Sequence, residues 1–371
     1  MSVDRRHGVE WSRRHFLAGL AALGGAAVLP AGVMRAQAPA AQTGAAAGAR
    51  RLDVHAHFAS PSWNKKNIDS KRAGFMQLQN WTPAKAIEEM DKAGVQMAML
   101  SSTQPGVSWT DDFSDKADAI AIAREMNEFG AKLVSDNKGR FGLFALLPLP
   151  DIDASLKEIA YAFDTLKADG VGLMTSYNNR YIGEAVFDPI LQELNRRNAV
   201  IYSHPTEGPC CHNIGGQAPG TVEWFTDTAR AILSVLAEGP GQGPTRAPSA
   251  ATKYSNINYI WSHGGGSLIG VANRVIGTVS ADDLSKPPMP NSRLANARRF
   301  YYDTALNTNP VVFPALAKLL GGTSHIVFGT DYPFGNQSAT VENLKTLGFT
   351  DQDLKGIDRD NILAILPKYK I

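Results

Sequence analysis

Four histidines and one aspartate stand at positions from which they could bind and use a metal ion. His55 and His57 are separated by one residue, and His204, His263 and Asp331 each follow a short apolar run and precede proline or glycine by one or two residues. Imidazole and carboxylate groups are the usual ligands of zinc and of several first-row transition metals. A His-x-His pair alone is a weak signal. Four segments that end in the same way indicate a metal-dependent enzyme.

The elements that must position these side chains are short β-rich runs, each followed by a helical pattern. The predicted strands are residues 51–58, 95–101, 140–147, 171–175, 199–204, 257–263, 300–304 and 325–330. The predicted helices are residues 82–93, 114–136, 153–168, 184–197, 221–237 and 310–320. Eight strands that alternate with helices predict a parallel (β/α)8 TIM barrel over residues 50–371. A doubly wound open sheet is the alternative, but no Gly-x-Gly-x-x-Gly motif follows the first strand.

In such barrels the chemistry lies at the carboxyl ends of the strands. His55 and His57 would point the same way because strand side chains alternate with a period of two. Asp53 would share their face one layer deeper, where hydrogen bonds to neighbouring strands would bury it. His325 opens the eighth strand and is therefore expected at the opposite end of the barrel. His212, in the loop after His204, is left open between substrate and solvent.

Residues 1–38 have the pattern of an export signal. Ser12-Arg13-Arg14-His15-Phe16-Leu17 looks like a twin-arginine motif, the 19 residues from Phe16 to Met34 carry no charge, and Ala36-Gln37-Ala38 resembles a cleavage site. We expect residues 1–38 to be a signal peptide and the Ala-rich residues 39–49 to be a linker, which predicts a periplasmic protein without stable membrane association after cleavage. An uncleaved membrane anchor is the alternative.

The charge balance excludes nucleic acid as an expected partner. The chain has 37 basic and 35 acidic residues, and residues 1–38 hold five of the basic and two of the acidic ones. The remainder is therefore close to neutral, with no basic stripe to follow a phosphate backbone. Its composition, 44% hydrophobic and 19% charged, is that of a globular protein.

Taken together, the motifs resemble the amidohydrolase superfamily. They comprise Asp53-Val54-His55-Ala56-His57-Phe58, Ser203-His204-Pro205, Trp261-Ser262-His263-Gly264-Gly265-Gly266, Tyr301-Tyr302-Asp303-Thr304-Ala305 and Phe328-Gly329-Thr330-Asp331-Tyr332-Pro333-Phe334. The residues of these motifs are similar to those of the branch that contains aminocarboxymuconate-semialdehyde decarboxylase and the salicylate- and resorcylate-type decarboxylases. This resemblance covers residues 51 to about 361.

The resemblance implies one divalent cation per subunit, bound by His55, His57, His204 and Asp331. The predicted fourth strand lacks the Lys or Glu that bridges two metals in binuclear relatives. Three imidazoles and a carboxylate favour Zn²⁺, with Mn²⁺ as the alternative. His263 and Asp331 would then be the catalytic residues that handle a proton.

The expected activity is non-oxidative decarboxylation of a small aromatic or unsaturated carboxylic acid that resembles salicylate. The same residues could also hydrolyse a lactone, ester or amide, so hydrolysis remains the alternative. A periplasmic metal- or solute-binding protein that has lost catalysis is a third hypothesis, against which the retention of His263 argues.

Several loop residues are candidates for substrate contact, although each could equally serve ordinary packing. They are Trp63, Trp109, Tyr177, Trp224 and Phe334, which could line an aromatic wall, and Arg274. The resemblance implies that Arg274 enters a neighbouring subunit's site to bind a carboxylate, which predicts a homodimer. The first predicted helix lacks the second carboxylate-binding arginine of the aminocarboxymuconate enzyme, which favours a monocarboxylate. Cys210 and Cys211 are expected to be free thiols because a vicinal disulfide is strained.

Overall fold

The computed structural model describes residues 50–70, 76–110, 113–207, 214–241 and 245–370. Its main sheet has eight parallel strands in the order in which they occur along the chain. They are β1 (Arg51–His57), β2 (Val95–Ser101), β3 (Phe141–Leu146), β4 (Gly170–Met174), β7 (Val200–His204), β8 (Asn258–Trp261), β9 (Tyr301–Asp303) and β10 (Ile326–Val327). Seven of them lie within the predicted strands, and β4 begins one residue before its predicted range of 171–175.

Hydrogen bonds between the first strand and the segment after the last one close the sheet into a barrel. The Val54 N–H donates to the Phe328 carbonyl at 2.9 Å, and the His57 N–H donates to the Tyr332 carbonyl at 2.7 Å. The Asp331 N–H donates to the His55 carbonyl at 2.8 Å. The (β/α)8 barrel prediction is confirmed, and the open doubly wound sheet is excluded.

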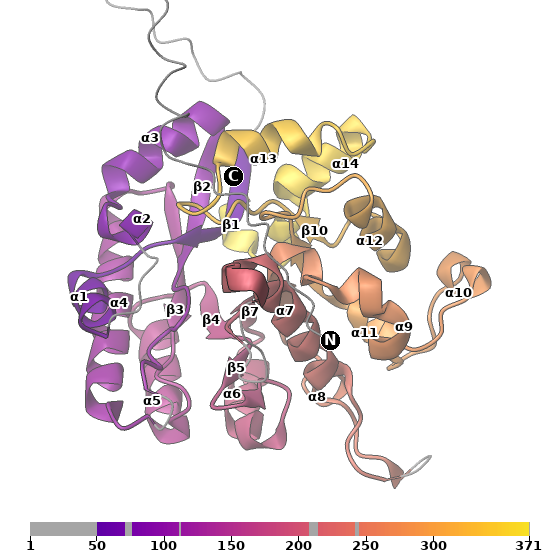
Figure 1. The fold of residues 1–371 in the computed structure, drawn as a ribbon, viewed down its shortest axis with the longest axis horizontal. Coiled ribbons are helices and arrows are strands. Elements are labelled where there is room, and N and C mark those ends of the chain that lie inside the picture. The colour runs from indigo at the N-terminus through magenta and orange to yellow at the C-terminus, as the bar shows by residue number, and fades with distance from the viewer. Residues whose placement is uncertain (1–49, 71–75, 111–112, 208–213, 242–244, 371) are drawn as a thin grey trace, which may run out of the picture. The chain divides into compact units, whose positions relative to one another are not determined.

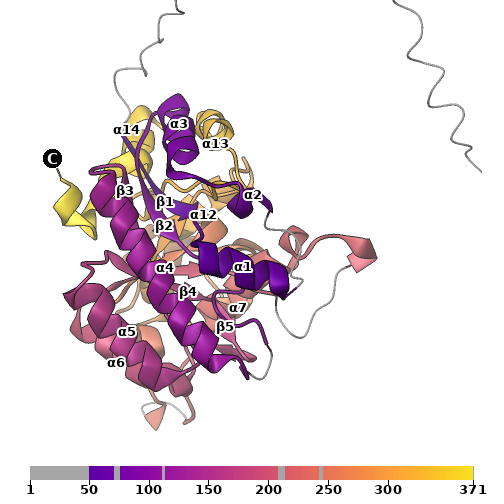
Figure 2. The same ribbon diagram turned by 90° about the vertical axis from the view of Figure 1, so that its left-hand side faces the viewer.

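Helices between the strands surround the barrel (Figures 1 and 2). Six of them are α3 (Pro83–Ala93), α4 (Lys116–Asp136), α5 (Ile152–Asp164), α6 (Asp188–Arg196), α7 (Glu223–Leu236) and α12 (Val312–Leu320). All six were predicted. Helix α3 shows why: the Thr82 hydroxyl caps its start, Pro83 occupies its first turn, and Gly94 ends it at a φ of 67°.

Further elements lie in the connections between the strands and helices named above and in the C-terminal segment. They are helices α1 (Pro61–Asp69), α2 (Met76–Gln79), α8 (Ala250–Lys253), α9 (Ala272–Val275), α10 (Ala281–Ser285), α11 (Arg293–Arg299), α13 (Gln337–Leu344) and α14 (Asp351–Lys355), and the hairpin of β5 (Ser176–Tyr177) and β6 (Arg180–Tyr181). Among the described residues, no helix is long and apolar enough to cross a membrane.

The barrel interior below the carboxyl ends of the strands is filled with apolar side chains. The cluster contains Leu52, Val54, Met97, Met99, Phe144, Val200, Tyr202, Ile260, Tyr301 and Val327, all from strands. Ile362, Leu363 and Leu366 join it from the C-terminal segment and cover the amino-terminal end of the barrel. The barrel is therefore a packed core rather than a pore.

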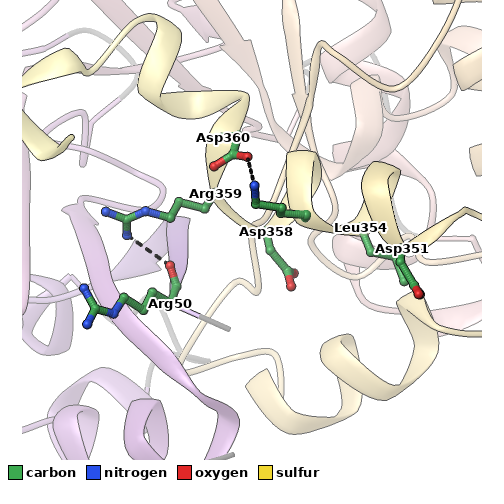
Figure 3. A pocket seen from close by; sticks show the side chains of 7 residues that line it. Arg50, Asp351, Leu354, Asp358, Arg359 and Asp360 are labelled. Carbon is green, nitrogen blue, oxygen red and sulfur yellow. Dashed lines mark hydrogen bonds and ion pairs between the residues drawn. The ribbon is translucent and has the colours of Figure 1, made fainter. Parts of the chain in front are cut away.

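A cavity of about 300 Å³ lies near the start of β1, at the end of the barrel opposite the carboxyl ends of the strands (Figure 3). It is lined by Arg50, Asp351, Leu354, Lys355, Asp358, Arg359 and Asp360. The Arg359 guanidinium donates to the Arg50 carbonyl at 3.1 Å, and Lys355 pairs with Asp360 at 3.3 Å. Residues from the start of β1 and from the C-terminal segment thus line this cavity together.

Candidate metal centre and active site

The carboxyl ends of three strands bring four buried side chains to one point. His55 and His57 lie on β1, His204 ends β7, and Asp331 follows β10. The potential ligand atoms of all four residues lie within 4.8 Å of one another. The His55 Nε2 atom is 3.0 Å from the His57 Nε2 atom and 3.2 Å from the Asp331 Oδ1 atom. A metal-binding site of three imidazoles and one carboxylate is therefore present.

The far nitrogen of each ligand histidine faces an acceptor, which sets the ring orientation. The Nδ1 atom of His55 lies 2.8 Å from the Asp303 Oδ2 atom. The Nδ1 atoms of His57 and His204 lie 3.3 Å from the Ser101 carbonyl and 3.0 Å from the Pro205 carbonyl. When Nδ1 carries the hydrogen, Nε2 offers its lone pair to the centre, which is the arrangement found in metal sites. The residues therefore fit a divalent cation.

The electrostatics of the cluster agree with this assignment. Burial raises the pKa of Asp331, but the His55 charge and hydrogen bonds from His263, His55 and His57 outweigh it and hold this pKa well below its usual value. Burial lowers the pKa of His57 and of His204. Burial also lowers the pKa of His55, but Asp303 and Asp331 overcome this and raise it to about 10. Asp303 and Asp331 therefore favour a positive charge at this point, which a bound cation would supply.

Asp331 has two oxygens that face different partners. Its Oδ1 atom lies 3.0 Å from the His57 Nε2 atom and 3.2 Å from the His55 Nε2 atom. Its Oδ2 atom lies 3.3 Å from the Nε2 atom of His263, which is buried but is not one of the clustered ligands. One oxygen thus faces the metal position and the other faces a titratable imidazole.

His263 lies in a tight turn rather than on a strand, which corrects the expectation that strand six extends to this residue. β8 ends at Trp261, and His263 has a φ of 54°. The next three glycines also have positive φ values. Left-handed backbone is costly for a residue with a side chain and is found most often at functional sites. The turn aims the His263 ring at the cluster.

The predicted eighth strand is shorter than expected. β10 contains two residues, and the Phe328 N–H donates to the Ile357 carbonyl at 2.9 Å instead of to a neighbouring strand. Ile357 belongs to the π-helical turn Gly356–Asp360. The C-terminal segment therefore replaces part of the strand pairing at the seam of the barrel.

Asp53 is buried by hydrogen bonds, as predicted, but it does not lie one layer below His55. Its Oδ1 atom accepts from the Thr330 N–H at 3.1 Å, and its Oδ2 atom accepts from the Gln337 amide of α13 at 3.3 Å. A register shift between Asp53 and Ala56 accounts for the change of face. Burial raises the pKa of Asp53 to about 7. His325 lies at the start of β10, at the opposite end of the barrel, as predicted.

Asp303 is the site residue that the sequence analysis quoted without giving it a role. It ends β9, is fully buried, and contacts both His55 and the backbone N–H of His263. Its position at the carboxyl end of a predicted strand was the available signal. Its partners, 248 and 40 residues away in sequence, were not visible.

The aromatic candidates fall into two groups. The Trp224 ring lies 6.2 Å from the His204 ring, and the Phe334 ring lies 5.8 Å from the His57 ring, so both flank the metal ligands. Trp63 donates to the Gly106 carbonyl at 2.7 Å and packs 6.5 Å from Trp109. The Tyr177 hydroxyl accepts from the Met174 N–H at 2.8 Å. Trp63, Trp109 and Tyr177 belong to the hydrophobic core, and substrate contact stays a prediction for all five residues.

The remaining candidates lie outside the cluster or outside the described residues. Arg274 is an exposed residue of the short helix α9, and its contact with a substrate stays a prediction. Cys210, Cys211 and His212 are outside the described residues, so the predicted state of the thiols also remains untested.

A closed parallel barrel with a buried His-His-His-Asp cluster at the carboxyl ends of its strands defines a metal-dependent (β/α)8 enzyme. The chain belongs to the amidohydrolase family, whose model matches residues 52–368.

Its curated relatives include decarboxylases of aromatic acids. The chain is 32% identical over 339 residues to the decarboxylase yanB of Aspergillus niger, with 86% of this chain and 88% of the relative covered. It is 30% identical over 331 residues to the 6-methylsalicylic acid decarboxylase of Penicillium expansum, with 86% and 97% covered.

The fold is also that of solved decarboxylases. A dihydroxybenzoic acid decarboxylase from Polaromonas sp. JS666, solved with manganese and the inhibitor 2-nitroresorcinol, is similar with a TM-score of 0.69 at 19% identity. The match covers 87% of this chain and 98% of the other.

Proposed function

We propose that the protein is a metal-dependent, non-oxidative decarboxylase of a small aromatic acid with a hydroxyl group beside the carboxylate. The observation that carries the proposal is the His263–Asp331 pair. His263 is a buried histidine outside the ligand set, and its Nε2 atom is 3.3 Å from the Asp331 oxygen that faces away from the other ligands. Binding or storage of a metal would not need such a residue.

A bound divalent cation would be held by His55, His57, His204 and Asp331, and it would polarise the substrate oxygens. The pair His263 Nε2–Asp331 Oδ2 would hold a proton and deliver it to the ring carbon that carries the carboxylate. That carbon becomes tetrahedral. The bond to the carboxylate then breaks, its electron pair restores the aromatic ring, and CO₂ leaves.

Trp224 and Phe334 support an aromatic substrate because they flank the metal ligands on two sides. The 6-methylsalicylic acid decarboxylase among the relatives supports a salicylate-like ring with a single carboxylate. We therefore propose 6-methylsalicylate and 2,6-dihydroxybenzoate as the first substrates to test.

The deciding experiment follows the origin of the atoms in the product. Metal-loaded protein is incubated with each acid in D₂O, and CO₂ and ring deuterium are measured. A decarboxylase must release CO₂ and place one deuterium on the carbon that lost the carboxylate. In a second arm, the protein is incubated with aryl esters and lactones in H₂¹⁸O. Incorporation of ¹⁸O into the product acid, together with no CO₂ release in the first arm, would overturn the proposal in favour of hydrolysis.

Zinc is our proposed metal, one per barrel, because three imidazoles and one carboxylate suit it best. The manganese in the dihydroxybenzoic acid decarboxylase supports the alternative. Elemental analysis of the purified protein and reactivation of metal-free protein with each ion would distinguish them. Two ions per barrel would contradict the assignment of a single site.

We further propose export to the periplasm through the twin-arginine pathway, supported by the Arg13-Arg14 motif and the uncharged segment after it. Replacement of both arginines with lysine should leave the protein in the cytoplasmic fraction. Periplasmic recovery of that double variant would contradict the proposal. A homodimer completed by Arg274 is proposed on the family resemblance and is tested separately below.

A further inference from the structure

We propose that Asp303 is a positioning residue that joins the metal site to the proton-handling turn. Each of its carboxylate oxygens contacts a different part of the site. The Oδ2 atom lies 2.8 Å from the His55 Nδ1 atom, and the Oδ1 atom accepts the backbone N–H of His263 at 2.7 Å. Asp303 is completely buried, so bulk water cannot reach its carboxylate and compete for these two contacts.

The contact with His55 selects the form of that ring which can bind a metal. A carboxylate only accepts hydrogen bonds, so the hydrogen of the His55 ring must be on Nδ1. The Nε2 atom, which lies 3.0 Å from the His57 Nε2 atom, then keeps its lone pair for the cation. Partners of this kind usually change metal affinity about 10–100-fold when they are removed.

The contact with His263 holds the turn that carries the imidazole. The His263 peptide is fixed on both sides, because its N–H donates to Asp303 and its carbonyl accepts from the Asn307 side chain at 2.9 Å. The φ of 54° at His263 is disfavoured for a residue with a side chain and needs such support. Asp303 therefore keeps His263 directed at Asp331.

Gly329 leaves the space in which Asp303 and His55 can lie close together. A Cβ atom on Gly329 would lie 2.8 Å from the Asp303 Cβ atom and 3.0 Å from the His55 Cβ atom. The Ala305 N–H also donates to the Asp303 Oδ1 atom, at 3.0 Å. Two backbone donors thus converge on one oxygen and leave the other for His55.

This double contact makes Asp303→Asn a selective test. The two N–H donors require the amide oxygen to remain at the Oδ1 position, which places the amide NH₂ opposite the His55 Nδ1 atom. That NH₂ can only donate, so His55 must move its hydrogen to Nε2 and lose its lone pair toward the metal. Asp303→Ala removes both contacts. Asp227→Asn is the matched control, because Asp227 is a buried carboxylate whose hydrogen-bond donors, Thr175, Tyr181 and Thr206, are all hydroxyls that can rotate.

The experiment measures two properties that do not require turnover. The first is the Kd of metal-free protein for Zn²⁺ and Mn²⁺ by chelator competition. We expect Asp303→Asn and Asp303→Ala to raise the Kd by about 10–100-fold, and Asp227→Asn to leave it within about threefold. A Kd in Asp303→Asn equal to that of Asp227→Asn would overturn the metal half of the proposal.

The second property is hydrogen exchange of the His263 amide. We expect it to be protected in the wild-type protein and in Asp303→Asn, and to exchange at least about tenfold faster in Asp303→Ala. An unprotected His263 amide in the wild-type protein would overturn the second half even if Asp303→Ala does not fold. The role assigned to His263 rests on the proposed function, but both readouts are independent of CO₂ release, so failure of one proposal is distinguishable from failure of the other.

Discussion

His263 and Asp331 share an unusual backbone conformation as well as a hydrogen bond. Their φ values are 54° and 63°. Each such residue costs about 1–3 kcal/mol, which the surrounding fold must offset. His263 is supported by Asp303 and Asn307, and Asp331 by its backbone bond to the His55 carbonyl. Both residues that would handle the proton therefore have a strained backbone conformation that their neighbours stabilise.

This division of roles predicts that His263→Ala separates metal binding from catalysis. Because His263 is not one of the clustered ligands, the variant should keep about one metal per barrel. It should lose about 10²–10⁴-fold in turnover, the usual contribution of a general acid or base. Elemental analysis and a CO₂ assay on the same sample provide the two measurements.

His204→Ala and His325→Ala are the comparisons for that variant. His204→Ala should lose metal and activity together, whereas His325→Ala, at the opposite end of the barrel, should keep both. Metal loss in His263→Ala would show that His263 is a ligand and would contradict the assignment.

At the scale of elements, the turn after β8 is packed tightly against helix α7. Gly266 has a φ of 61°, and a Cβ atom there would lie 2.1 Å from the Phe225 carbonyl oxygen. The Phe225 ring in turn lies 5.1 Å from the His263 ring. The glycine therefore allows α7 and the His263 turn to approach each other.

Gly266→Ala should consequently move the turn or the helix. We expect a loss of stability of about 2 kcal/mol or more, because the substitution combines a backbone clash with a disfavoured φ. Turnover should fall with it, since His263 shifts. Gly270→Ala is the control, because a Cβ atom at Gly270 meets nothing within 4 Å. Equal melting temperatures for the two variants would show that the contact is not tight.

Local sequence signals determine which elements of the fold could be predicted from the sequence. The eight strands and six of the helices between them were predictable because apolar runs, caps and glycines are local signals, whereas α1, which is as long as α6 and α12, was missed. The β5–β6 hairpin was missed, since each of its strands has only two residues. The end of β8 was misplaced because nothing local indicates that Ser262 leaves the strand. Position at strand ends indicated the candidate metal-binding side chains, and the family resemblance implied which four of them are ligands. The link from Asp303 to His55 depends on tertiary contact and could not be predicted.

At the scale of the whole molecule, the ligands join distant parts of the barrel. A metal that binds only the folded protein stabilises it, by about 2.7 kcal/mol at a free concentration 100 times the Kd. Chelation should therefore lower the melting temperature by several degrees. His204→Ala should already melt lower and show little further change with chelator. An unchanged melting temperature of the wild-type protein on verified metal removal would contradict a bridging site.

Arg274 provides a test of assembly. If it completes a neighbour's site, Arg274→Ala should lose most activity while its melting temperature and metal content stay unchanged. An equal mixture with His204→Ala, refolded together, should regain about a quarter of the wild-type activity, since half of the random dimers contain one complete site. Full activity of Arg274→Ala alone, or no recovery in the mixture, would exclude sharing.

The barrel closes where β1 meets the segment after β10, so its closure depends on residues that are synthesised late. The Asp53–Thr330 contact joins residues 277 positions apart, and Asp331 reaches His55 and His57 across the same seam. The residues that cover the base of the barrel, Ile362 to Leu366, come later still. A growing chain on the ribosome therefore holds only an incomplete ligand set until nearly all of it has emerged. The complete four-residue site can therefore form only late in synthesis, after Asp331 has emerged and the barrel has closed.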